Sequence, residues 1–172
     1  MSNVIGSQTA RKGPGTMQVR IVRLEPMHVA CIKALGATPE ADAWSALLAW
    51  ARGKGLLNEA RPYRLFGYDD PSGGKNGIHG YDAWITVSPD IRCRPEERVQ
   101  IQEFAGCLYA VTRCRLPDAV DTWARLREWV TNSPYPLGNH QWLEEYLTLT
   151  SDLAHPHASW QDTLLDLYHP VA

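Results

Sequence analysis

Two adjacent carboxylates lie in an aromatic segment near the C-terminal end of the sequence. Residues 142–147 read WLEEYL, and alternation predicts a β-strand over 140–149. Because side chains alternate between the faces of a strand, Trp142, Glu144 and Tyr146 share one face. An acid between aromatic rings loses hydration, which raises its pKa and lets it attract a cation or carry a proton near neutral pH. The alternative is that Glu144 is a solvated acid without a role.

Alternating hydrophobic residues and turn signals predict the elements that position this segment. A helix should begin at Thr38-Pro39-Glu40 and another at Pro117-Asp118, since proline and acids favour the first turn. Residues 1–16 show no periodicity and are expected to form a flexible tail outside the fold. Strands are expected over 19–24 and 29–35, paired through a tight turn, and over 63–68, 81–87, 98–104, 107–114, 140–149 and 163–171, with loops at 69–74 and 151–159.

The second half of the sequence repeats the first about 80 residues further on. Val19-x-Ile21 recurs as Val99-x-Ile101, Ala30 as Ala110, Trp44-x-x-Leu47-x-x-Trp50 as Trp123-x-x-Leu126-x-x-Trp129, and Leu65-x-x-Tyr68 as Leu143-x-x-Tyr146. This order predicts a duplicated ββαββ unit, with repeats at about 17–88 and 97–172. The expected fold is α+β, a mainly antiparallel sheet with two main helices on one side, arranged about a pseudo-twofold axis that leaves a cleft. In the first repeat the position equivalent to Glu144 is Phe66, so one half offers an aromatic ring where the other offers an acid.

The composition fits one globular domain. The chain has 172 residues, of which 44% are hydrophobic and 21% charged, and its formal net charge is −2, which disfavours direct DNA binding. No apolar stretch predicts a membrane span or a secretory signal, so a cytoplasmic protein is expected. The four cysteines form no CxxC pair and are expected to be reduced and mostly buried. Seven Trp and seven Tyr against two Phe indicate apolar surfaces that also meet water or a ligand.

Three local motifs are better explained by structure than by chemistry. His155-Pro156-His157 lacks further ligands for a tetrahedral metal set and is expected to be a solvated loop. Gly73-Gly74-Lys75 lacks the spacing and the following Ser or Thr of a phosphate loop. Asp69-Asp70 could bind a cation, but a turn-capping role before Pro71 is commoner. Neither a metal nor a cofactor is therefore expected.

An ordered set of short motifs carries a family resemblance over nearly all of residues 17–172. The chain resembles the GyrI-like small-molecule-binding domains, which are similar to the effector-binding domains of AraC- and MerR-type multidrug-responsive regulators. The motifs are Val19-x-Ile21 with Pro26 and Val29-Ala30, Trp44-x-x-Leu47, Phe66-Gly67 before Asp70-Pro71, Tyr81-Asp82 with Ile85 and Val87, Tyr109-Ala110-Val111, Trp123-x-x-Leu126, Leu143-Glu144-x-Tyr146-Leu147, and Asp166-Leu167-Tyr168 with Pro170-Val171.

The resemblance implies a tandem ββαββ fold of SH2-like motifs, with an aromatic pocket at the pseudo-twofold axis. The family's glutamate, which contacts cationic or planar drugs, corresponds to Glu144. The residues before Met17 are too few and too polar for a helix-turn-helix reader, so a stand-alone domain is expected. The predicted ligand-binding residues are Glu144, Tyr146, Trp142, Phe66, Tyr68, Tyr109, Trp123 and Tyr168.

Three functions are open for such a domain. The first is binding of hydrophobic, often cationic small molecules, for sensing or sequestration. The second, known for some stand-alone relatives, is hydrolysis of strained electrophilic compounds such as cyclopropanoid drugs, in which Glu144 would be catalytic by positioning or deprotonating water. The third is a gyrase-binding role, which no residue here supports specifically. A residue set of one carboxylate and several rings favours binding over hydrolysis.

Overall fold

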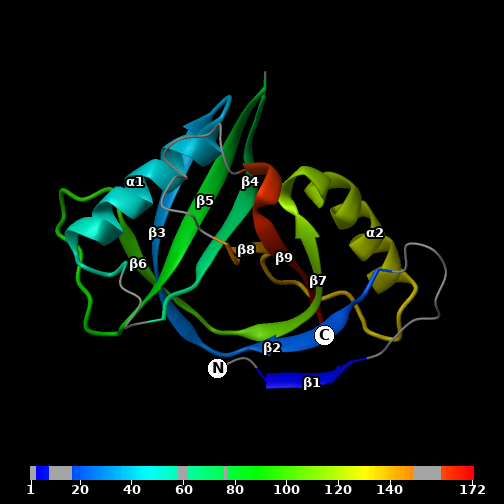
Figure 1. The fold of residues 1–172 in the computed structure, drawn as a ribbon. Coiled ribbons are helices and arrows are strands. Elements are labelled where there is room, and N and C mark those ends of the chain that lie inside the picture. Colours follow the sequence, from blue (N-terminus) through cyan, green and yellow to red (C-terminus); the bar gives the residue numbers. More distant parts are fainter. Residues whose placement is uncertain (1–2, 8–16, 58–61, 76, 149–159) are drawn as a thin grey trace. The chain divides into compact units, whose positions relative to one another are not determined.

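The computed structural model describes residues 3–7, 17–57, 62–75, 77–148 and 160–172, which fall into two compact units. Each unit is an antiparallel sheet with one main helix, so the predicted α+β class is confirmed. In chain order the elements are β1 (Asn3–Ser7), β2 (Arg20–Leu24), β3 (Met27–Gly36), α1 (Pro39–Gly53), β4 (Leu65–Lys75), β5 (Ile78–Val87), β6 (Gln100–Phe104), β7 (Cys107–Arg115), the 3₁₀ turn η1 (Leu116–Asp118), α2 (Ala119–Thr131), β8 (Leu143–Tyr146), the 3₁₀ turn η2 (Trp160–Asp162) and β9 (Leu164–Val171) (Figure 1).

The first unit contains β1, β2, β7, α2, β8 and β9, with strand order β1-β2-β7-β9-β8. Helix α2 packs on β7 and β9 through its buried residues, which include Leu126 and Val130. The helix starts where Thr122 Oγ1 donates to the carbonyl of Asp118 (2.7 Å). It ends where the side chain and the main-chain N–H of Asn132 both donate to the carbonyl of Glu128, at 2.9 and 3.1 Å.

The second unit contains β3, α1, β4, β5 and β6, with strand order β4-β5-β3-β6. Helix α1 packs on β3 and β5, and Trp44 and Leu47 on its inner face are fully buried. Pro39 fits the first turn, and Glu40 and Asp42 compensate the partial positive charge of that helix end. Both predicted helices are therefore confirmed.

The predicted pairing of the strands at 19–24 and 29–35 is wrong. Strand β2 pairs with β7 in the first unit, and β3 pairs with β5 and β6 in the second unit, so β2 and β3 belong to different units and are not neighbours in the strand order. Alternation identified both strands, but a short Pro-containing connection between them does not distinguish a hairpin from a crossing chain. The first unit thus takes β2, which lies between β1 and β7, from the first half of the sequence, and the second unit takes its edge strand β6 from the second half.

The two units have the same strand order around this exchanged strand, β2-β7-β9-β8 in one and β6-β3-β5-β4 in the other. Ile21 pairs with Ala110 in the first unit, and Ile101 pairs with Ala30 in the second. These are the residues that the predicted repeat makes equivalent. The shared register supports the duplication, while the pseudo-twofold axis and the cleft stay predictions.

A charge pair also recurs at equivalent positions. In the second unit Lys33 lies opposite Asp82, with Nζ and Oδ2 4.0 Å apart. In the first unit Arg113 lies opposite Asp166, and its Nε donates to Oδ1 at 2.8 Å. Both carboxylates are buried, so each basic partner offsets the cost of removing a charge from water.

Two segments differ from the sequence-based expectation. Asn3–Ser7, expected in a flexible tail, forms β1 and pairs with β2. Residues 69–74, expected in a loop from their Asp, Pro and Gly content, continue β4 to Lys75. Pairing with β5 supplies the main-chain hydrogen bonds that composition alone would not suggest. The predicted loop at 151–159, with its histidines, lies outside the described residues.

The remaining general expectations concern the membrane and the cysteines. Among the described residues, no helix has both the length and the apolar character needed to cross a bilayer. Cys31, Cys93, Cys107 and Cys114 are free thiols, the first and third of them buried. Burial raises the pKa of Cys31 to about 11, so this thiol stays protonated and unreactive at neutral pH.

Candidate functional site

The carboxylate of Glu144 lies on the helix-bearing face of the first unit's sheet. Trp123, on α2, donates from Nε1 to Glu144 Oε1 at 2.9 Å. Both side chains are half-buried, so the acid is neither in bulk solvent nor sealed in the core. The bond fixes one carboxylate oxygen against an indole edge, which orients the group.

Trp142 extends this arrangement into a row of rings. Its ring centroid lies 5.2 Å from that of Trp123 and 4.3 Å from that of His169. Trp142 is 40% exposed, which is unusual for so large an apolar residue and leaves ring surface open to a guest. We call Trp123, Trp142, Glu144 and His169 the indole–acid cluster.

His169 completes the cluster from β9 as a neutral group. Its Nδ1 donates to the carbonyl of Pro170 at 3.0 Å, and Nε2 is buried with no hydrogen-bond partner in the described part of the chain. Burial, aided by the nearby Arg127, holds the pKa of His169 below its usual value. The sequence analysis did not single out His169. The sequence does contain an indication of it. In the alternating series Leu165-x-Leu167-x-His169, a polar residue occupies a position where the buried face of the strand favours an apolar one.

Register explains which other predicted residues share this face. Glu144 is paired with Leu167, and Tyr146, two residues on, is paired with Leu165, so both point to the face that α2 covers. Tyr146 is buried, at 6% exposure. The predicted set of Trp142, Glu144 and Tyr146 on one side of β8 fits this register.

Tyr109 and Tyr168 lie on the opposite face of the same sheet. Tyr168 donates to Glu145 Oε2 at 2.5 Å, and the two tyrosine rings meet edge to face with centroids 5.5 Å apart. Tyr109 donates to the carbonyl of Gln141 at 2.9 Å, and burial raises its pKa, which keeps it a neutral donor. The structure therefore does not bring these two tyrosines to Glu144. Tyr168 instead satisfies the buried Glu145, the neighbouring acid that sequence reasoning passed over.

Phe66 and Tyr68 belong to the second unit, so their sharing a site with Glu144 stays a prediction. Phe66 is fully buried, and the guanidinium of Arg64 lies 4.8 Å from its ring centroid. Tyr68 is half-buried and meets Trp84 edge to face at 5.5 Å. Burial, together with a hydrogen bond to Asp82, raises the pKa of Tyr68, so its hydroxyl remains protonated.

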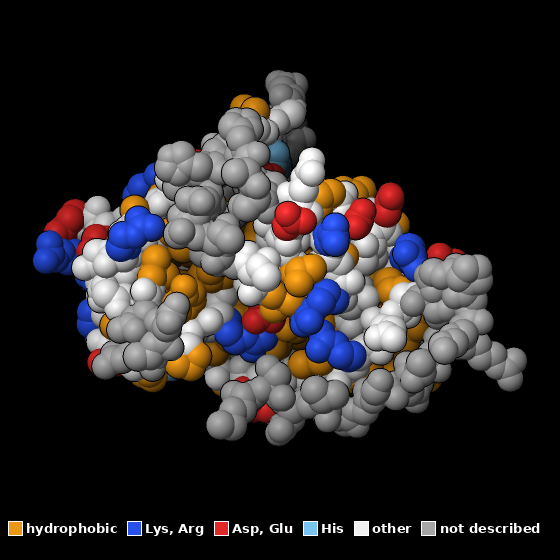
Figure 2. Space-filling view, in the orientation of Figure 1, with side chains coloured by type: hydrophobic (Ala, Val, Ile, Leu, Met, Phe, Trp, Pro, Cys, Tyr) orange, Lys and Arg blue, Asp and Glu red, His pale blue; other side chains and the backbone are white. Residues whose placement is uncertain are grey.

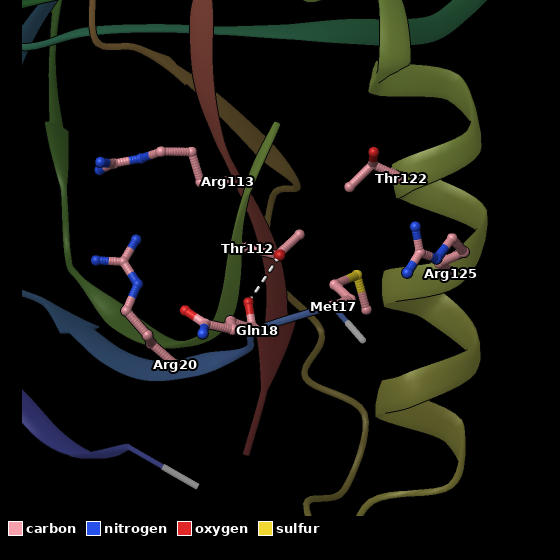
Figure 3. Close-up of a pocket in the computed structure, with 7 residues that line it drawn as sticks. All are labelled: Met17, Gln18, Arg20, Thr112, Arg113, Thr122 and Arg125. Carbon is pink, nitrogen blue, oxygen red and sulfur yellow. Dashed lines mark hydrogen bonds between the residues drawn. The ribbon is translucent and has the colours of Figure 1, made fainter. Parts of the chain in front are cut away.

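The first unit also contains an open cavity of about 560 Å³. Figure 3 shows its lining residues, which come from the start of the described chain after residue 16, from β2 and β7, and from α2: Met17, Gln18, Arg20, Thr112, Arg113, Thr122 and Arg125. Asp166 accepts hydrogen bonds from Arg20 and Arg113, so one carboxylate faces two guanidinium groups. Three arginines in the lining disfavour a cationic guest, and none of the predicted site residues contributes to it.

Charge elsewhere on the visible face is mixed. Figure 2 shows acidic and basic side chains interspersed with hydrophobic ones, in keeping with the formal net charge of −2. This face therefore offers a guest local charges of both signs rather than one broad field.

Comparison with solved structures shows the fold. EcmrR in complex with DNA gives a TM-score of 0.60 at 13% identity, covering 90% of this chain and 57% of that one, so the chain spans little more than half of EcmrR. The EcmrR C-terminal domain alone gives a TM-score of 0.60 at 14% identity, and the match covers 91% of this chain and 98% of that domain. A hydrolase from Listeria innocua gives a TM-score of 0.60 at 14% identity, and the match covers 90% of this chain and 91% of the hydrolase. SAV2435 bound to tetraphenylphosphonium gives a TM-score of 0.50 at 13% identity, and the match covers 91% of this chain and 94% of SAV2435.

Sequence comparison identifies the family. No curated protein matches the sequence. The family model described as GyrI-like small molecule binding domain matches residues 17–161, which is most of the chain. By that match, the chain belongs to the GyrI-like small molecule binding domains.

Proposed function

We propose that this domain binds hydrophobic small molecules that are often cationic or planar, and that Glu144 supplies the counter-charge. The observation that supports this most directly is the half-buried Glu144 carboxylate, held by Trp123 at 2.9 Å beside the exposed ring of Trp142. A domain of this kind would serve to sense or to sequester drugs or toxins.

The chemistry of the indole–acid cluster suits a lipophilic cation. Ring faces attract positive charge, at about 0.5–2 kcal/mol for each well-placed contact. A carboxylate adds a charge interaction that strengthens as the guest displaces water. Because Trp142 is 40% exposed, its ring can stack on a flat guest without unfolding of the sheet.

Relatives support the choice of ligand class. One protein of the same fold, SAV2435, has been solved with tetraphenylphosphonium, a hydrophobic cation. We extend that ligand class to this chain as part of the proposal. Tyr146 on the same face of β8 would line the rest of the site, whereas Tyr109 and Tyr168 would support it from the opposite face of the same sheet.

The test is a titration of the protein with tetraphenylphosphonium, followed by tryptophan fluorescence and calorimetry. Glu144→Gln should weaken binding by about 1–3 kcal/mol, roughly 5- to 150-fold, because the cation loses its partly desolvated counter-charge. The melting temperature should stay nearly unchanged, since Gln keeps an oxygen that can accept the Trp123 N–H.

Two controls make this result specific. Glu128→Gln, at an exposed position on α2, changes the net charge equally and should leave affinity unchanged. Triphenylphosphine oxide, a neutral guest of similar shape, should bind wild type and Glu144→Gln alike. Unchanged affinity of Glu144→Gln for the cation would remove Glu144 from the site, and no fluorescence response at saturating cation would refute the aromatic pocket.

Hydrolysis of a strained electrophile is the second candidate. A hydrolase from Listeria innocua shares the fold, and a half-buried carboxylate can position water for attack. Incubation with a cyclopropane-bearing electrophile, followed by mass spectrometry, should then show a product heavier by one water. Turnover that survives Glu144→Gln would exclude this role for the residue.

A further inference from the structure

Three potential metal ligands meet in the second unit. Glu40, Asp69 and His79 each present one ligand atom, and these three atoms all lie within 4.8 Å of one another. They come from three elements, α1, β4 and β5, and are far apart in the sequence. For this reason no local spacing motif in the sequence predicts that these three residues meet.

The fold holds these residues in place. Glu40 lies in the first turn of α1. Asp69 is paired with Tyr81 across the β4–β5 ladder, and His79 lies two residues before Tyr81, so the Asp69 and His79 side chains point to the same face. This is the helix face, because the indole of Trp44 on α1 donates to the Tyr81 hydroxyl.

The charges around these three residues favour the binding of a cation. The neighbouring acids Asp70 and Asp82 both lie beside Lys33, as ion pairs. The charged groups that act on Asp69 within the described chain are instead Glu40 and His79. Two carboxylates thus face a single imidazole. With both carboxylates ionised, the group carries a net negative charge whether His79 is protonated or neutral.

The donor set and the distances suit a first-row transition ion. Imidazole nitrogen and carboxylate oxygen are both ligands of Zn²⁺, and a zinc site with three protein ligands keeps its fourth position open for water. In a tetrahedral site with bonds of about 2.0–2.1 Å, ligand atoms lie about 3.3 Å apart. His79 Nε2 and Glu40 Oε1 are 2.9 Å apart, so this pair need widen by only about 0.4 Å. Asp69 is exposed and the other two are half-buried, which gives an ion access.

We propose that Glu40, Asp69 and His79 form a divalent metal site, with Zn²⁺ as the ion that their donor set favours and water in the remaining position. The ion would join the start of α1 to the β4–β5 hairpin and so stabilise the second unit. The site is separate from the proposed Glu144 function, which belongs to the first unit, so either can fail without the other.

The experiment is calorimetric titration of tag-free, metal-stripped full-length protein with Zn²⁺. We expect one ion per chain, and a free Zn²⁺ concentration a hundred times Kd should shift the folding equilibrium by about 100-fold. For a domain of this size the melting temperature should then rise by roughly 5 to 10 °C. His79→Ala and Glu40→Gln should each weaken binding at least tenfold.

A matched control distinguishes this site from any other histidine. His28 also pairs with a glutamate in the second unit, Glu103, at 3.0 Å. His28→Ala should bind Zn²⁺ as wild type does. Co²⁺ in place of Zn²⁺ should give weak visible bands without intense sulfur charge-transfer absorption, since no thiolate belongs to the site. Wild-type affinity in both His79→Ala and Glu40→Gln, equal loss in His28→Ala, or sulfur charge-transfer bands would each overturn the proposal.

Discussion

Replacing Gly67 with alanine should damage the second unit, because β4 has no room for a side chain at this position. A Cβ there would lie 1.9 Å from the Tyr81 hydroxyl oxygen and 2.6 Å from the carbon that bears it. Cβ atoms do not approach other heavy atoms below 3.0 Å, so the ring would have to move by about 1 Å, the difference between 3.0 and 1.9 Å. Tyr81 is 2% exposed and receives the Trp44 indole hydrogen bond at 3.3 Å, so it has no free space to enter.

The expected cost follows from these two constraints. Overpacking of a filled core costs about 1–3 kcal/mol, and loss of the Trp44–Tyr81 hydrogen bond costs about 0.5–1.5 kcal/mol. The free energy of unfolding should therefore fall by about 2–4 kcal/mol. At about 2–4 °C per kcal/mol for a protein of this size, the melting temperature should drop by roughly 5 to 15 °C.

Urea unfolding followed by circular dichroism measures the change, with Gly53→Ala as the matched control. A Cβ at Gly53 meets nothing within 4 Å, and alanine is the better helix former, so that variant should be as stable as wild type or slightly more so. In a Tyr81→Leu background the clashing atoms are absent, and the cost of Gly67→Ala should fall below about 1 kcal/mol. A full cost in that background, or none in wild type, would refute the steric explanation.

Two other changes test the first unit. The depressed pKa of His169 means that the unfolded chain takes up this proton near pH 6.5 while the folded chain resists it, so stability should fall as pH drops below about 6.5. Urea unfolding at pH 7.5, 6.5 and 5.5 should show a shallower pH dependence for His169→Gln, and an identical slope would contradict the assignment. Asp166→Asn should lower the free energy of unfolding by about 1–3 kcal/mol, since the partly exposed Arg20 and Arg113 lose a shared, buried acceptor. Asp42→Asn, in an exposed pair, should cost less than about 0.5 kcal/mol in the same assay.

The elements of the fold could largely be predicted from sequence, whereas their pairing could not. The start of α1 at Pro39 and the span of β9 follow from local signals that the structure confirms. The partner of β2 does not follow from local signals. Alternation indicates which face of a strand is buried, but it does not indicate which other strand pairs with it. The extension of β4 to Lys75 was missed for a related reason: the ladder with β5 overrides residues that favour turns.

The candidate site shows the same division. Period-two alternation placed Glu144 and Tyr146 on one face, which the β8–β9 register shows. The hydrogen bond from Trp123 depends on how α2 packs, and the separation of Tyr168 from Glu144 depends on which β9 residue lies opposite each β8 residue. Those are tertiary facts, which no local pattern contains.

The crossing of β2 and β6 has a consequence for how such a chain could have arisen and how it can be divided. A half-length ancestor with one ββαββ segment would leave a sheet lacking its outer strand, unless two copies traded their first strands in a homodimer. Fusion of the two genes would preserve that trade within one polypeptide. We therefore expect that neither half of the present chain folds when expressed by itself and that co-expressed halves complement each other.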